Sequence, residues 1–132
     1  MENDVEAVKR ANESFYRAFE GLDIQTMEAV WSKEDYVKCI HPGWEVQMGW
    51  PSVRDSWVLI FNNTHAMRFS VCLVDARIYG DCAVIVCLES ISTRADEEKW
   101  LEGQVLATNI FECRDGRWLM VHHHGSPLVP QG

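Results

Sequence analysis

Hydrophobic side chains recur every three or four positions in the first part of the chain and every second position in the later part. The first spacing is typical of an α-helix with one buried face, and the second is typical of a β-strand. The change of spacing falls near residue 66. The pattern therefore predicts helices first and a sheet second, which is an α+β fold.

The first helix is predicted over residues 4–21, with Asn3 or Asp4 as its cap. Its apolar stripe has the three- and four-residue steps of a buried helix face, and it consists of Val5, Val8, Ala11, Phe15, Ala18, Phe19 and Leu22. Asn12 lies inside this stripe and Tyr16 lies at its edge. A polar group on a buried face needs a partner, so these two side chains either hydrogen-bond within the core or line a pocket.

Two shorter helices are predicted, over residues 24–31 and residues 51–61. Between them, residues 36–42 read as a strand. Pro42 ends this strand because proline cannot donate a backbone hydrogen bond to a sheet. The residue before a proline is held extended, which places His41 at the end of the strand.

The second half of the chain reads as strands. Residues 67–79 alternate, but the apolar phase changes at Val74, and such a change predicts a β-bulge or a bend. Residues 82–92 are apolar on both faces as far as Leu88, so both faces of this strand are expected to be covered. Residues 105–113 form the next predicted strand.

A hairpin is predicted at the end of the chain, with its turn at residues 115–116, an Asp-Gly pair that tolerates the positive φ angles of a tight turn. The last strand then carries three consecutive histidines. Strict alternation places His122 and His124 on the same face as Met120 and places His123 on the other. We expect the first two to face the interior and His123 to face outward.

Composition narrows the possible partners. With 132 residues the chain suits a single domain over residues 1–132. Its net charge of −8 argues against nucleic acid or an anionic membrane as a partner, because both require a basic surface. The five cysteines include no Cys-x-x-Cys pair, and no apolar run reaches the length of a membrane helix. These features are typical of reduced thiols in a cytoplasmic protein.

Several short sequence motifs occur in an order and at a spacing that resemble a known family. They are Ala11-Asn12, Phe15-Tyr16-Arg-Ala-Phe19, Asp23 with Met27 and Trp31, Cys39-Ile-His-Pro-Gly-Trp44, Gly49 with Val53 and Ser56-Trp57, Gly80-Asp81-Cys-Ala, Ala107-Thr-Asn-Ile-Phe111, Gly116-Arg-Trp118, and His122-His-His-Gly-Ser-Pro127. Together they resemble the SnoaL-like branch of the nuclear transport factor 2-like superfamily.

This resemblance implies a cone: a strongly curved antiparallel sheet wrapped around the N-terminal helices. It also implies a pocket for an apolar small molecule, a homodimer built on the outer sheet face, and no cofactor. The superfamily includes enzymes that transfer protons, such as ketosteroid isomerase, dehydratases, cyclases and epoxide hydrolases. It also includes the non-catalytic kinase association domain. Catalysis and binding without catalysis therefore both remain open.

His41 is the candidate catalytic residue, because it precedes Pro42 where ketosteroid isomerases carry an aspartate as general base. A histidine can accept a proton near neutral pH. The isomerase oxyanion pair is not reproduced, since the helix tyrosine position falls on Phe15 and residues 108–110 contain no acid. The other candidate ligand contacts are Asn12, Tyr16, Asn109, His122 and His124, with Trp44 and Trp57 at the rim of the pocket.

Two further interpretations of the histidines are open. His41, His122 and His124 could together hold zinc, but no acidic residue is predicted nearby, and we predict no metal. Alternatively, the histidines hydrogen-bond to Asn12, Asn109 or the backbone and brace the sheet against the first helix.

Overall fold

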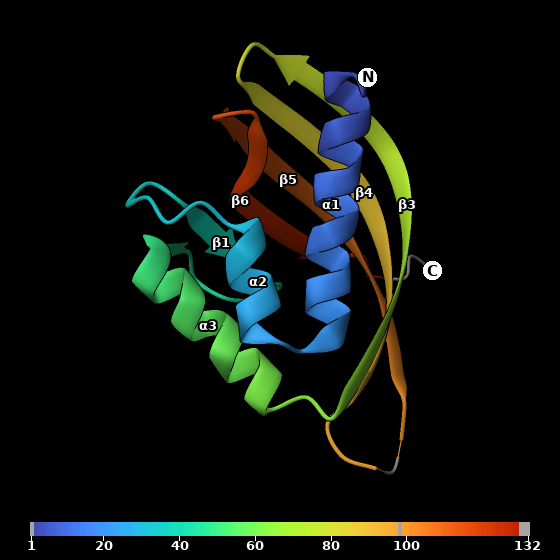
Figure 1. The fold of residues 1–132 in the computed structure, drawn as a ribbon. Helices are drawn as coiled ribbons and strands as arrows, with labels where there is room; N and C mark the ends of the chain where they lie inside the picture. The colour runs from blue at the N-terminus through green and yellow to red at the C-terminus, as the bar shows by residue number, and fades with distance from the viewer. Residues whose placement is uncertain (1, 98, 130–132) are drawn as a thin grey trace.

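The computed structural model describes residues 2–97 and 99–129 (Figure 1). The helices and strands follow one another in the order that the hydrophobic pattern predicts. They are α1 (Asp4–Gly21), α2 (Ile24–Val30), β1 (Lys38–Ile40), β2 (Gln47–Met48), α3 (Trp50–Asn62), β3 (Ala66–Tyr79), β4 (Cys82–Arg94), β5 (Leu101–Arg114) and β6 (Arg117–Pro127). In the described part of the chain, no helix is long and apolar enough to cross a membrane.

The helix α1 has the predicted bounds. The Asn3 side chain accepts a hydrogen bond from the backbone N–H of Glu6 at 2.9 Å, which caps the first turn. The following residue, Leu22, takes the left-handed conformation with φ of 54° that closes the helix. One face of α1 is buried, and it consists of Val8, Phe15, Ala18 and Phe19 of the predicted stripe together with Asn12 and Tyr16, whereas Val5 of that stripe is exposed.

The sheet is curved and open, and the helices lie against its concave side, with α1 running along β3 and β4 (Figure 1). The strand order is β2-β1-β6-β5-β4-β3. The four long strands pair in an antiparallel manner, as predicted. The short strand β1 adds a parallel pairing with β6 beside these four strands.

The predicted irregularity in β3 is present. The pairing of β3 with β4 shifts by one residue between Leu73 and Asp75, so Val74 is the extra residue of a β-bulge. We call the face of the sheet that turns toward α1 the inner face and the opposite one the outer face. Because of the bulge, β3 keeps apolar side chains on the inner face along its whole length.

A second bulge lies in β6 and was not predicted. Ile110 of β5 pairs with His122 whereas Phe111 pairs with Met120, which leaves Val121 as the extra residue. The bulge shifts the alternation by one position. His123 therefore lies on the inner face, and our prediction that His122 and His124 face the interior is wrong.

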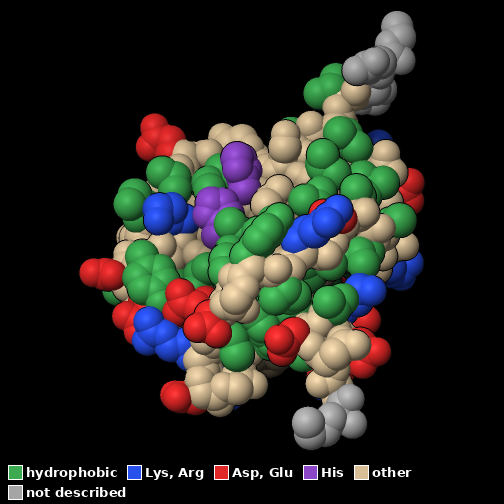
Figure 2. Space-filling model, turned by 90° about the horizontal axis from the view of Figure 1, so that it is seen from above, with side chains coloured by type: hydrophobic (Ala, Val, Ile, Leu, Met, Phe, Trp, Pro, Cys, Tyr) green, Lys and Arg blue, Asp and Glu red, His purple; other side chains and the backbone are tan. Residues whose placement is uncertain are grey.

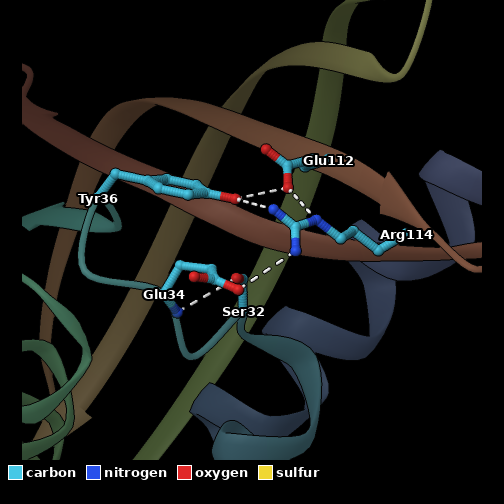
Figure 3. Close-up of polar contacts among 5 residues, drawn as sticks. All are labelled: Ser32, Glu34, Tyr36, Glu112 and Arg114. Carbon is cyan, nitrogen blue, oxygen red and sulfur yellow. Dashed lines mark hydrogen bonds and ion pairs between the residues drawn. The ribbon is translucent and has the colours of Figure 1, made fainter.

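A polar cluster holds the segment between α2 and β1 against the end of β5 (Figure 3). The Arg114 guanidinium donates to Glu112 at 2.9 Å, to the Tyr36 hydroxyl at 3.0 Å and to Glu34 at 3.3 Å. Tyr36 in turn donates to Glu112 at 2.6 Å, and the backbone of Glu34 donates to the Ser32 hydroxyl. This cluster holds the chain that leads into β1 close to the end of β5.

Aromatic side chains fill the space between the helices and the sheet. Trp57 of α3 is fully buried and meets Phe15, Phe19 and His41 edge-on, with ring centroids 4.6 to 5.7 Å apart. Edge-to-face contacts at these distances are favourable. Trp57, which was predicted to lie at the rim of a pocket, is therefore a core residue.

Candidate functional site

A cavity of about 340 Å³ lies between α1 and β3. Its volume falls in the range of small-molecule sites, which is roughly 300–1,000 Å³. The β3 wall is apolar and consists of Phe69, Val71 and Leu73. The α1 wall is polar or charged, and its side chains are Lys9, Asn12, Glu13, Tyr16, Arg17 and Glu20.

Two of the sequence candidates, Asn12 and Tyr16, form part of this lining, and both are almost completely buried. Behind Tyr16 lies Glu89 of β4, whose side chain is 2% exposed. The Tyr16 hydroxyl donates a hydrogen bond to the Glu89 carboxylate. Sequence reasoning missed Glu89, although it continues the inner-face series that begins with Ala83 and Ile85.

Asn109 of β5 organises the polar groups below the cavity. Its amide nitrogen donates to Asn12 Oδ1 at 2.8 Å and to the Tyr16 hydroxyl at 3.1 Å. Its carbonyl oxygen lies 2.6 Å from Nδ1 of His123. A carbonyl oxygen only accepts, so Nδ1 of His123 carries the proton. Asn109 is thus a buried partner of the cavity-lining residues and does not itself line the cavity.

Burial sets the acid–base properties of this group. It raises the pKa of Glu89 from 4.5 to about 7, although the hydrogen bond from Tyr16 acts in the opposite direction. Burial, and then the charge of Glu89, raise the pKa of Tyr16. The Cys87 thiol lies 3.2 Å from the Tyr16 hydroxyl, and burial raises its pKa as well. Near neutral pH, Glu89 is the member of this group that exchanges a proton most readily.

His41 belongs to a separate polar group. Its Nε2 lies 2.9 Å from the Ser56 hydroxyl, which itself donates to the carbonyl of Val53 at 2.7 Å. Since that hydroxyl proton is already used, Nε2 of His41 is the donor. Burial lowers the pKa of His41 to about 4. His41 does not line the cavity between α1 and β3.

The remaining candidates lie elsewhere. Trp44 is partly exposed and contacts the His41 ring at 4.9 Å between centroids. His122 and His124 lie next to each other on the outer face, with ring centroids 6.3 Å apart. Figure 2 shows histidine side chains at the surface beside hydrophobic and basic ones. The alternation of residues could not separate these histidines from His123 without knowledge of the bulge.

Metal ligands are not gathered at any of these places. Over residues 2–97 and 99–129, no three His, Cys, Asp or Glu side chains are placed so that they could share a metal ion. His41 lies in the core, whereas His122 and His124 lie on the outer face. The arrangement at the cavity instead offers hydrogen-bond donors and one carboxyl group that titrates near neutral pH.

The helices packed on a curved open sheet define a protein of the nuclear transport factor 2-like superfamily. A profile of the SnoaL-like domain family matches residues 8–130, and the chain therefore belongs to that family.

Three known proteins are similar to this chain. A crystal structure of a candidate dehydratase of the NTF2-like family from Streptomyces avermitilis is 34% identical, with a TM-score of 0.89, and 96% of this chain and 97% of that chain are covered. A candidate calcium/calmodulin-dependent protein kinase type II association domain from Thiobacillus denitrificans is 33% identical, with a TM-score of 0.82 and coverage of 92% and 94%. The F-box protein SKIP8 of Arabidopsis thaliana is 35% identical over 93% of this chain, which spans about half, 50%, of its length.

Proposed function

We propose that this protein binds an apolar small molecule in the cavity between α1 and β3 and transfers a proton to it without a cofactor. The observation that carries this proposal is the hydrogen-bonded pair of Tyr16, which lines the cavity, and the buried Glu89 behind it. A carboxyl group with a pKa of about 7 is present in both protonation states at neutral pH. This property suits a general acid or base.

The pair can pass a proton by a balanced exchange. When Glu89 is protonated, the hydrogen bond between the two side chains is reversed. Glu89 then donates its proton to the Tyr16 oxygen while Tyr16 gives its own proton to an oxygen of the ligand, so the net change is one proton from Glu89 to the ligand. The raised pKa of Tyr16 makes a free tyrosinate unfavourable. The two proton transfers must therefore be coupled. One such step is sufficient to assist enolisation or dehydration, the reactions of isomerases and lyases.

Asn12 and Asn109 support this role by holding the Tyr16 oxygen. Asn109 donates to Tyr16, and Asn12 occupies the other hydrogen of the Asn109 amide. The remaining candidates, His41, Trp44, Trp57, His122 and His124, lie outside this cavity lining. Their proposed ligand contacts, and the proposed role of His41 as a base, would require a different site.

Binding of 2-naphthol, a fluorescent apolar molecule with a single hydroxyl group, tests this proposal. We expect the wild-type protein to change the emission of 2-naphthol, and we expect Tyr16→Phe to weaken binding about tenfold through loss of a buried hydrogen bond. Tyr36→Phe, which removes an exposed hydroxyl of the Arg114 cluster, is the matched control. Equal affinities for the wild type and folded Tyr16→Phe, or no binding to either, would contradict the proposal.

A second candidate function is a non-catalytic association module. The outer face carries a row of apolar side chains on β4 and β5, and these are Val84, Val86, Leu88, Leu106 and Ile110. An apolar face of this kind is suited to pairing with a second copy. We infer that two copies pair through this face to form a homodimer. An assembly larger than a dimer, such as a ring, would instead favour the association module.

We also propose a cytoplasmic location. The five cysteines are all free, which is typical of a reducing compartment.

A further inference from the structure

The polar groups of the cavity wall lie along one line of α1. Lys9 and Tyr16 are seven residues apart, which is two helical turns and about 10 Å along the axis. Both side chains line the cavity, with Asn12 and Glu13 between them. The opposite wall is formed by the β3 side chains Val71 and Leu73. A ligand lying along this groove therefore meets a hydroxyl at one end, an ammonium group near the other and apolar side chains between them.

Most of the charges at the cavity rim are already matched. Arg17 and Glu13 form an ion pair at 3.5 Å. Glu20 accepts a hydrogen bond from the backbone N–H of Phe69 at 2.8 Å, which attaches the end of α1 to β3. Among the charged lining residues within the described part of the chain, Lys9 is left without an ion pair or hydrogen bond. A cation facing an apolar wall favours an anionic ligand group.

We propose that the natural ligand is an elongated apolar carboxylic acid, whose carboxylate pairs with Lys9 and whose oxo or hydroxyl oxygen lies at Tyr16. An oxo- or hydroxy-substituted aromatic or unsaturated acid has this chemistry. The Tyr16 end of the inference rests on the proposed function above, whereas the Lys9 end adds the substrate class. The apolar body would pack on Phe69, Val71 and Leu73.

Two fluorescent probes separate the two ends. 2-Naphthol offers only the hydroxyl, and 6-hydroxy-2-naphthoate adds a carboxylate at the far end of the same rings. We expect the wild-type protein to bind the naphthoate about fivefold more tightly, as for a partly exposed ion pair, with a gain that shrinks as salt is added. Lys9→Gln should remove this gain, so that this variant binds the two probes with equal affinity.

Lys99→Gln is the control variant, because it removes the same charge from the exposed β4–β5 connection. It should keep the preference for the naphthoate. Equal binding of the two probes to the wild-type protein, or a preference that persists in Lys9→Gln, would overturn the substrate class but leave the proposed function standing. Failure of the wild-type protein to bind either probe would overturn both.

Discussion

Nδ1 of His123 lies 2.6 Å from Oδ1 of Asn109 in the core of the protein. This contact fixes the orientation of the Asn109 amide, so that its nitrogen faces Asn12 and Tyr16. Tyr16 therefore accepts a hydrogen bond from Asn109 and donates one to Glu89. His123 thus acts on the proposed acid–base pair through two other side chains and makes no contact with the cavity itself.

Replacement of His123 by phenylalanine should destabilise the protein. The substitution leaves the buried Asn109 carbonyl without a donor, which costs about 1–3 kcal/mol of the free energy of unfolding. Urea denaturation measures this loss. The exposed His65 is the matched control, and His65→Phe should change the free energy of unfolding by less than about 0.5 kcal/mol. Equal stabilities for the two variants would show that the Asn109 carbonyl finds another donor.

Glu89→Gln should alter how stability depends on pH. The folded pKa of Glu89, about 7, lies above the ordinary value of 4.5. The favourable contribution of Glu89 is therefore fully present below pH 4.5 and is lost as the pH rises through 7. Relative to the wild type, Glu89→Gln should gain stability between pH 4.5 and pH 8, by up to roughly 3 kcal/mol.

Urea unfolding of both proteins at pH 5 and pH 8 checks this expectation. The histidines are common to the two proteins, so their contributions cancel in the difference. Glu13→Gln, at an exposed position, should show the same pH dependence as the wild type. A constant difference between wild type and Glu89→Gln at the two pH values would mean that Glu89 is already ionised at pH 5.

His41→Ala should destabilise the fold. The imidazole is buried against Trp57 and donates to Ser56, and truncation of a buried side chain of this size costs about 2–5 kcal/mol. The pKa of His41 is lowered to about 4 from 6.5, so the stability that it contributes is present above pH 6.5 and is lost as the pH falls toward 4. Chemical denaturation at pH 7 and pH 5 measures both effects. Full stability of His41→Ala together with loss of activity would instead restore His41 as a catalytic base.

Val86→Lys should separate the copies of the proposed dimer. Val86 lies in the middle of the apolar row on the outer face, where a buried ammonium group would be left unpaired. Sedimentation should give a dimer for the wild type and a monomer for Val86→Lys. Leu59→Lys, on an exposed position of α3, should remain a dimer. A monomeric wild type would contradict the dimer.

Much of the fold could be predicted from the sequence because the hydrophobic residues of each helix or strand follow a single dominant spacing. The stripe of α1 gives its bounds, and the phase change in β3 places the bulge at Val74. The short strand β1 pairs parallel with β6, and no local pattern indicates such a long-range pairing.

The candidate site was harder to predict. Asn12 and Tyr16 are visible as polar residues on a buried helix face, and both line the cavity. Glu89 was missed because the other face of β4 is also apolar, which hides the alternation that places Glu89 inside. The position of His41 before Pro42 identified it as a candidate but could not reveal that α3 packs Trp57 and Ser56 over it.

The extra residue Val121 has a consequence for how this strand could change in evolution. A strand has two faces, and a single unpaired residue exchanges them for everything that follows it. If Val121 paired regularly with Ile110, His122 and His124 would lie in the core and His123 would lie outside, whereas loss of the Val121 codon would remove the bulge and leave His123 inside. Which histidine is internal thus depends on whether Val121 is bulged out of the pairing with β5, and not on the identity of the three residues.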